Sequence, residues 1–439
     1  MRFAWLALLF QGMIAFIIQH TTWFAAHTDL VSWTIVLFTS SVLVFAMFRK
    51  YKTLDVVTII LVGYFLRLLL LFWDIYFRDV FDLIHSGIDS EMFYRESVRQ
   101  LHGLFVNRPG TYQSFLYYVF RLFGQQRIIA QYINLLLGFS GILLTLQIFQ
   151  RFRTNRRAGK IMLAVGMFAP NFMILNVILL REALVACALI VSFYCFVLWF
   201  KDNKFGGLVL AVTFTLIAAS FHSAAIAPAI GYAICIVFYD RNRGTFRFKA
   251  TTVFLIVICI AVVYVIDQLF GATVFRRFIG VDSIPALMAA AGRAEQGEAV
   301  YSILIFTGND ALDFLVNTPL RMVYFILSPL PWDWRGIIDV LAFAMSSSFY
   351  GYVYYLAYKA LRNRQSENRQ MIILLLLIAI ISAFIFGWGV SNAGTAMRHR
   401  DKFFLLHLLM FGLCLGQAKS KQASLLSHIR AKARKPHEN

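Results

Sequence analysis

Apolar residues in this chain come in runs of about 17–22 residues, separated by polar segments. A helix needs about 20 apolar residues to cross a hydrocarbon core of about 30 Å, whereas the strands of a membrane barrel alternate over about 10 residues. The pattern therefore predicts an all-α fold, a polytopic integral membrane helix bundle. About twelve transmembrane helices are expected, at residues 3–19, 30–48, 56–76, 128–149, 161–179, 183–200, 206–221, 223–239, 252–270, 337–358, 371–389 and 403–417.

The composition agrees with a membrane protein. Hydrophobic residues make up 60% of the 439 residues and charged residues only 14%, whereas roughly a quarter of the residues in a soluble domain are charged. The five cysteines all lie in apolar runs, without a CxxC motif. They indicate small buried side chains rather than disulfides or a metal site.

The polar segments between the predicted spans alternate in charge. Short basic segments occur at 49–52, 151–160, 201–204, 241–249 and 359–369. Because cytoplasmic loops are enriched in Lys and Arg, these segments place both termini in the cytoplasm. The prediction is a single transmembrane domain at 1–418, with two long outward loops at about 77–127 and 271–336, and a basic cytoplasmic tail at 419–439.

This topology also explains the formal net charge of +19. Most of the excess belongs to the cytoplasmic loops and their attraction to anionic membrane lipids, so no nucleic-acid partner is expected. Sixteen basic residues remain outside or within the membrane, and fifteen of them are arginine. Guanidinium groups bind phosphate oxygens through paired hydrogen bonds, although arginines also extend toward lipid headgroups. The outward arginines indicate an anionic ligand, such as a lipid-linked diphosphate.

Both outward loops contain apolar segments that differ from ordinary spans. Residues 111–123 are aromatic and too short to span, and they predict an interfacial or re-entrant helix. Residues 315–330 contain Pro319 and Arg321, and a full span there would place the basic 359–369 loop outside. We therefore expect this segment to re-enter or to lie at the interface, with Arg321 facing a protein-lined cavity.

Two carboxylates stand two residues apart in the first outward loop. Asp89 and Glu91 belong to the segment Gly87–Arg95, and either side chain could act as a general base or a cation ligand. The same stretch suits a structural role, in which Asp89 or Ser90 caps a helix that runs through Glu91 to His102. The two interpretations are compatible.

Two short outward turns carry titratable residues beside apolar spans. Arg181 and Glu182 lie between the fifth and sixth spans, where a charged pair is costly unless it faces a polar cavity or a protein group. His222 lies in the next outward turn, and it is a candidate acid, base or hydrogen-bond donor to phosphate. The alternatives are an interfacial ion pair and a structural histidine.

The densest cluster lies between the last two spans, in the segment Ser391–Lys402. Arg398 and Arg400 flank His399 there, an arrangement that predicts phosphate binding and proton transfer. The alternative is a basic turn that extends toward headgroups. Positive charge on the outward side runs against the usual orientation bias, which favours the functional interpretation.

Four stretches together resemble the bacterial oligosaccharide repeat-unit polymerases, the Wzy-type and EpsG-like proteins of capsule, O-antigen and exopolysaccharide synthesis. They are Gly87–Glu91 in the first outward loop, Leu180–Ala183, Phe221–Ser223 and Gly394–Arg400. The resemblance implies an enzyme of the bacterial cytoplasmic membrane that polymerises undecaprenyl-diphosphate-linked oligosaccharide repeat units on the outer face. It also implies a flippase and a chain-length regulator as partner proteins.

In that reaction, arginines would stabilise the departing diphosphate, and a carboxylate or histidine would deprotonate the acceptor hydroxyl. The predicted diphosphate-binding residues are Arg181, Arg321, Arg398 and Arg400. The predicted catalytic residues are Asp89, Glu91, Glu182, His222 and His399. Neither a cofactor nor a metal ion is expected, and no nucleotide-sugar motif is present in the sequence.

Two other functions stay open. A multi-spanning, GT-C-type glycosyltransferase with a polyprenyl-phosphate sugar donor also places an acidic residue in its first outward loop, as in Gly87–Glu91. A polysaccharide or lipid-linked sugar transporter should carry polar residues within several spans and a repeat of its two halves. The chain shows charge within a span only at Arg67 and Asp74, and no internal repeat. The transporter is therefore the least favoured.

Overall fold

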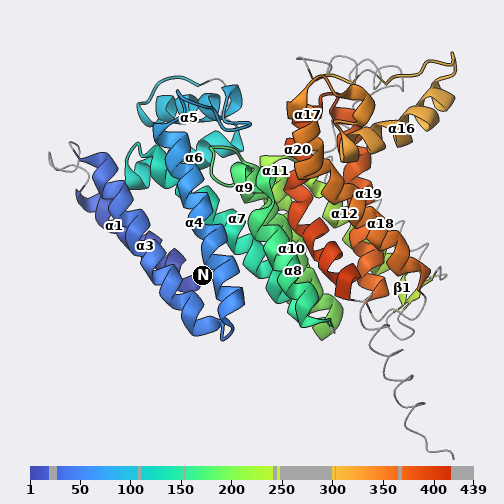
Figure 1. Ribbon diagram of the computed structural model, residues 1–439, viewed down its shortest axis with the longest axis horizontal. Coiled ribbons are helices and arrows are strands. Elements are labelled where there is room, and N and C mark those ends of the chain that lie inside the picture. Colours follow the sequence, from blue (N-terminus) through green and yellow to red (C-terminus); the bar gives the residue numbers. More distant parts are fainter. Residues whose placement is uncertain are drawn as a thin grey trace, which may run out of the picture. The chain divides into compact units, whose positions relative to one another are not determined.

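The computed structural model describes residues 1–18, 27–106, 110–152, 154–240, 245–247, 299–301, 303–363 and 368–416. The predicted span 252–270, the first part of the second long loop and the basic tail 419–439 lie outside the described residues. The described residues are almost entirely helical (Figure 1). Among them, β1 (Tyr239–Asp240) and β2 (Thr245–Phe246) form a two-stranded antiparallel pair.

Six helices in the described ranges are long and apolar enough to cross a membrane. They are α3 (Thr28–Lys50), α4 (Leu54–Tyr76), α7 (Arg127–Gln150), α10 (Glu182–Asp202), the continuous segment Ile337–Arg362 and α19 (Arg369–Gly389). Each coincides with a predicted span, so the all-helical architecture, with several helices able to cross a membrane, is confirmed. The number of twelve spans stays a prediction.

Shorter helices occupy most of the other predicted spans. They are α1 (Arg2–Ile18), α11 (Phe205–Phe221), the 3-10 turn η1 (Ser223–Ile226) followed by α12 (Ala227–Phe238), and a helix at 404–416. The predicted span 161–179 is interrupted, because α8 (Arg156–Phe168) ends before Pro170, which opens the short helix α9 (Pro170–Leu175). Proline has no backbone N–H and cannot continue the hydrogen-bond ladder of α8.

The chain forms two compact units. Unit 1 contains Met1–Leu143, Leu163–Ala188 and Ser220–His222. Unit 2 contains Leu144–Met162, Leu189–Ala219 and Ser223–Asn439.

Buried hydroxyl groups join three helices of unit 1. Ser40 of α3 lies 2.6 Å from the hydroxyl of Tyr64 of α4, and that hydroxyl lies 2.9 Å from Tyr132 of α7. Thr39 of α3 donates to Tyr132 at 2.8 Å. Hydrogen bonds of this kind between membrane helices contribute about 0.6 kcal/mol each. The cluster therefore aligns α3, α4 and α7 in addition to their apolar packing.

Arg67 shows how the bundle accommodates a charge within a span. Its side chain is fully buried, and it donates to the carbonyls of Gly63, Gly166 and Met167. The carbonyl of Gly166 has no helical partner because the residue four positions later is Pro170. The guanidinium of α4 thus satisfies the carbonyls at the end of α8, and Arg67 holds the break in place.

Two further helices of unit 1, α5 (Ile88–Leu101) and α6 (Thr111–Phe123), belong to the first long loop. The bounds of α6 are those of the predicted interfacial helix. The two helices pack through Phe93 and Tyr112, whose ring centroids are 5.1 Å apart. The prediction that Asp89 or Ser90 caps this region is wrong, because α5 begins at Ile88 and Gly87 is its N-cap.

Unit 2 is built around the pairing of α16 (Asp310–Leu327) with α19. Phe314 stacks on Trp388 at 5.4 Å, and Phe325 stacks on Phe386 at 5.3 Å. A Cβ at Gly387 would lie 3.2 Å from the backbone of Arg321, so glycine permits this close crossing. The other elements are η2 (Pro331–Asp333), α17 (Ile337–Ala342), the π-helical turn η3 (Phe343–Ser347), α18 (Ser348–Arg362), α20 (Ala393–Arg400) and η4 (Asp401–Phe403).

Candidate functional site

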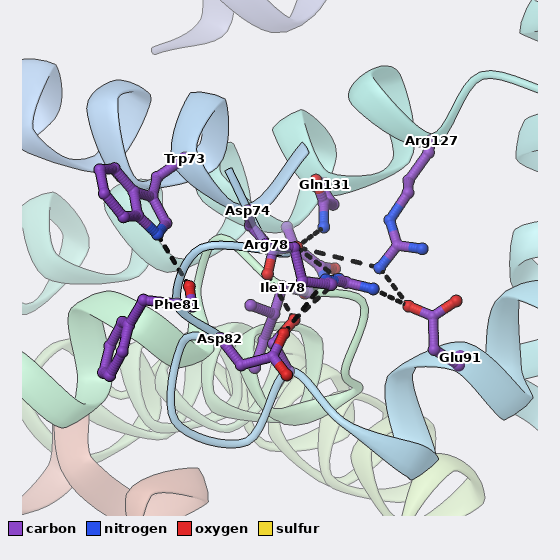
Figure 2. A network of polar contacts seen from close by, with 11 residues as sticks. Trp73, Asp74, Arg78, Phe81, Asp82, Glu91, Arg127, Gln131 and Ile178 are labelled. Carbon is purple, nitrogen blue, oxygen red and sulfur yellow. Dashed lines mark hydrogen bonds and ion pairs between the residues drawn. The ribbon is translucent and has the colours of Figure 1, made fainter. Parts of the chain in front are cut away.

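Asp74, near the carboxyl end of α4, is the centre of a buried polar network in unit 1 (Figure 2). Its carboxylate accepts hydrogen bonds from Arg78 at 2.9 Å, from Gln131 of α7 at 2.6 Å and from the hydroxyl of Ser86. A buried carboxylate is costly unless it is paired and hydrogen-bonded, and these three donors meet that requirement. The network fixes the segment that follows α4 against α7.

Glu91, in the first turn of α5, joins this network through two guanidinium groups. Its carboxylate pairs with Arg78 and with Arg127, whose nitrogen lies 2.7 Å away (Figure 2). Partial burial alone would raise the pKa of Glu91, but hydrogen bonds and charges from Arg127 and Arg78 outweigh burial and lower it. A carboxylate with a lowered pKa is a weak general base. Glu91 is therefore better suited to holding the two arginines than to accepting a proton.

The pKa of Arg78 is shifted in the opposite direction, upward. Burial alone would lower the pKa of Arg78, but the charges of Asp74 and Glu91 raise it. The guanidinium is thus held between two carboxylates, one at the end of α4 and one at the start of α5. This arrangement ties the two helices together across the loop.

Asp89 lies in the same first turn of α5 and is half-buried. Successive helical residues are about 100° apart, so Asp89 and Glu91 face different sides of the helix. The ion pairs of the network involve Glu91. The structure therefore separates two carboxylates that the sequence presents as a pair.

Arg181 ends a buried, non-helical turn at 176–181, between α9 and α10. The turn is held by Asn134 of α7, whose amide nitrogen donates to the carbonyls of Ile178 at 2.8 Å and Leu180 at 2.9 Å. Buried carbonyls outside a helix need such partners, above all in a membrane. The amide of Asn134 also donates to the Tyr112 hydroxyl at 2.9 Å, which links α6 to the turn.

Arg181 joins two of the stretches that carry the family resemblance, Leu180–Ala183 and Phe221–Ser223, and lies beside α5, which begins within a third. Its guanidinium donates to the carbonyl of Phe221 at 3.1 Å and lies 6.0 Å from the ring centroid of Phe93. Thr111, at the start of α6, donates to the carbonyl of Ser220 at 2.8 Å. The turn before α10, the end of α11 and the α5–α6 pair therefore meet at this arginine.

Glu182 and His222 lie beside this junction. Glu182 is the first residue of α10 and is buried. Burial raises the pKa of Tyr112, the hydrogen bond from Asn134 partly offsets that effect, and the nearby charge of Glu182 raises the pKa further. His222 directly follows Phe221 and is half-buried. Unit 1 thus holds Asp89, Glu91, Arg181, Glu182 and His222.

The other predicted site residues belong to unit 2. Arg321 of α16 is fully buried and donates to the carbonyls of Gly387 at 2.8 Å and Val390 at 3.0 Å, and to the hydroxyl of Ser391 at 2.8 Å. Its guanidinium lies 5.4 Å from the ring centroid of Trp388. These contacts fix the end of α19 and the start of the segment that leads to α20.

Arg400, at the end of α20, is bound by neutral oxygen atoms. It donates to the hydroxyls of Ser346 and Ser347 and to the carbonyls of Ile326 and Ser328, at 2.8–3.2 Å. Each of its three nitrogen atoms makes at least one of these bonds. The guanidinium therefore connects the end of α16 to the π-helical turn η3, a structural task that competes with binding of a diphosphate.

His399 and Arg398 are neighbours of Arg400 with different surroundings. His399 is buried, and its Nδ1 lies 2.7 Å from the Nζ atom of the buried Lys402. An ammonium is a donor only, so a charged Lys402 makes Nδ1 the acceptor and leaves the proton on Nε2. Arg398 is half-buried, and it is the more accessible of the two arginines of α20.

The sequence did not single out the partners that organise unit 1. Asp74 and Arg78 are four residues apart, a spacing typical of a local ion pair, and this was the available signal. Arg127 begins α7, 36 residues after Glu91 in the chain, and nothing local connects the two. Asn134 is a single amide in an apolar run. Its role as the hydrogen-bond donor to the turn at 176–181 is evident only from the folded structure.

In the part of the chain that the structure describes, no group of three or more His, Cys, Asp or Glu side chains is arranged to hold a metal ion. Comparison with protein-family models, with curated proteins and with solved structures gives no match. The functional argument therefore depends on the geometry of the two units and on the sequence motifs.

Proposed function

We propose that this protein is a glycosyltransferase of the bacterial cytoplasmic membrane that polymerises undecaprenyl-diphosphate-linked oligosaccharide repeat units on the outer face. The observation that carries the proposal is the position of Arg181. It lies on a buried turn and contacts both the carbonyl of Phe221 and the ring of Phe93. A guanidinium fixed in this way, where two motif stretches meet beside α5, is suited to a diphosphate.

The reaction forms a bond between an acceptor hydroxyl oxygen and the anomeric carbon of the donor chain. The bond from that carbon to the diphosphate breaks, and the electron pair leaves with undecaprenyl diphosphate. Arg181 stabilises the charge that develops on the departing oxygen. Asp89, Glu182 or His222 accepts the proton of the acceptor hydroxyl, because the lowered pKa of Glu91 makes that carboxylate a weak base.

One observation favours a second candidate function. Acidic residues open α5, and α5 packs against α6 within the first long loop. This layout also suits a GT-C-type glycosyltransferase, in which a carboxylate of that loop acts as base toward a polyprenyl-phosphate sugar. The two functions differ in the donor: an oligosaccharide on a diphosphate in one, a single sugar on a monophosphate in the other.

The test uses the full chain in nanodiscs with either donor. The diphosphate-linked repeat unit is extracted from the producing strain after deletion of this gene, and the products are separated on a gel. A ladder of polymer is expected with the diphosphate donor and its loss with Arg181→Ala. Arg121→Ala is the matched control, because Arg121 is an exposed arginine of α6. Turnover of the monophosphate donor alone would replace this proposal by the second function.

A further inference from the structure

Unit 1 contains a cleft of about 310 Å³ beside the Asp74 network. This volume is at the low end of small-ligand sites, which range from about 300 to 1,000 Å³. Twelve residues from α3, α4, α5 and α7 and their flanking segments line it. Ile75 and Ile128 are the only wholly aliphatic side chains among them. The cleft is therefore unusually polar for a ligand site.

The charges of the lining exclude a strongly ionic ligand. Three carboxylates, Asp29, Asp74 and Asp79, face two guanidinium groups, Arg78 and Arg127. Both arginines are already paired with carboxylates of the network. A diphosphate would meet an excess of negative charge, and a bare cation would meet two guanidinium groups. A neutral ligand with many hydroxyl groups avoids both conflicts, since hydroxyls donate to carboxylates and accept from guanidinium and amide groups.

The remaining lining supplies amide and aromatic groups. Gln126 is buried and its Oε1 accepts from Ser32 at 2.8 Å, so its amide nitrogen remains as the donor of that side chain. Gln125 donates to the hydroxyl of Tyr94 at 3.0 Å, and the Tyr94 ring is held by Arg127, 5.4 Å from its centroid. A rigid tyrosine ring offers the flat apolar surface on which the C–H face of a sugar ring can pack.

We infer that this cleft binds one neutral sugar ring of the glycan substrate. The inference depends on the proposed function for the identity of the glycan, and on the cleft itself for the sugar chemistry. Arg127 lines the cleft and also pairs with Glu91, so the sugar subsite adjoins the network that holds the start of α5. Its exposed polar residues are Asp29, Tyr76, Asp79 and Gln125, and the last two have no charged partner among the described residues of the network.

The test is binding of the full chain in nanodiscs to a printed array of bacterial surface oligosaccharides. Asp79→Ala and Gln125→Ala are each expected to weaken binding about tenfold, the effect of losing a hydrogen bond to a charged group or a comparable polar contact. Asp82→Ala is the matched control, because Asp82 is an exposed carboxylate three residues away that does not line the cleft. Thermal unfolding midpoints equal to wild type show that each variant is folded.

Two further measurements distinguish a failure of this inference from a failure of the proposed function. Arg181→Ala should bind glycan normally while it fails to polymerise, and excess inorganic diphosphate should leave glycan binding unchanged. Glycan binding that is weakened by Asp79→Ala and by Gln125→Ala supports the subsite even if wild-type protein makes no polymer. Absence of binding to any glycan, displacement by inorganic diphosphate, or equal binding by both cleft variants and wild type overturns the inference.

Discussion

The guanidinium of Arg181 donates a hydrogen bond to the backbone carbonyl of Phe221, 3.1 Å away. The two residues are 40 positions apart in sequence: Arg181 ends the turn before α10, and Phe221 is the last residue of α11. Because the bond goes to a carbonyl, it orients the guanidinium without neutralising it. This bond differs in kind from the contacts of Arg78, which is held between two carboxylates.

Arg181→Lys is expected to reduce polymerisation at least about 100-fold, with little change in thermal stability. Lysine keeps the charge but lacks the planar fork that grips paired phosphate oxygens, and loss of one such stabilising group costs about 10²–10³ in rate. The measurement is the initial rate of ladder formation together with the unfolding midpoint. Arg121→Lys, on the exposed side of α6, should be active. Unchanged activity of Arg181→Lys would exclude paired binding at this residue.

Asp74→Ala should destabilise the folded protein by about 3 kcal/mol, because it leaves the half-buried Arg78 and two further donors without their acceptor. The side chain of Asp74 is fully buried, and Arg78, Ser86 and Gln131 all donate to it. Unfolding in detergent, followed by circular dichroism, measures the change. Asp82→Ala is the control, since that carboxylate is 66% exposed and lies 3.8 Å from Arg78. The control should change stability by less than about 0.5 kcal/mol.

The Glu91 ion pairs predict an acid-dependent loss of stability. The folded-state pKa of Glu91 lies below its unfolded value of about 4.3, because Arg127 and Arg78 favour the ionised carboxylate. The stabilisation is therefore complete above that value and is lost as the pH falls through the folded-state pKa. Unfolding midpoints measured from pH 3 to pH 8 should fall more steeply at the acid end for wild type than for Glu91→Gln. Parallel curves for the two proteins would contradict the ion pairs.

The sequence predicts those features that depend on local pattern. The bounds of α6 follow from an apolar segment between Gly110 and Gly124, and six predicted spans coincide with long apolar helices. The pattern does not predict the start of α5, because Asp89 and Ser90 are favourable caps but Gly87 occupies that position. It also does not predict the break at Pro170, since apolar residues continue on both sides of it.

The site depends on contacts that a sequence alone does not reveal. Arg398 and Arg400 are two residues apart in one basic segment and look equivalent. In the folded protein, Arg400 is buried among serine hydroxyls and carbonyls, whereas Arg398 is half-buried. Likewise, the pairing of Glu91 with Arg127 requires α5 to pack near the start of α7, and no periodicity encodes that approach.

Arg400→Lys is expected to destabilise the protein by at least about 2 kcal/mol. Lysine has three donors in place of the five of arginine, so some of the buried hydroxyls and carbonyls around position 400 would lose their partner. Arg398→Lys, two residues away and half-buried, should unfold at the wild-type midpoint. Differential scanning calorimetry of the purified variants measures both unfolding midpoints. A stable Arg400→Lys protein that fails to polymerise would assign this arginine to the substrate instead.

Gly138→Ala should displace the turn that carries Arg181. A Cβ at Gly138 would lie 2.2 Å from the side chain of Asn176, the first residue of that turn, and overpacking of this kind costs about 1–3 kcal/mol. Polymerisation should fall along with stability, because the turn positions Arg181. Asn176→Ala removes the clashing atoms, so the double variant Gly138→Ala/Asn176→Ala should regain stability relative to Gly138→Ala alone. The coupling energy of this double-mutant cycle is the measurement.

Gly206→Ala, with open space around the new methyl group, is the control for a glycine substitution within a helix. Additive effects of the two substitutions would show that α7 and the turn do not pack as described.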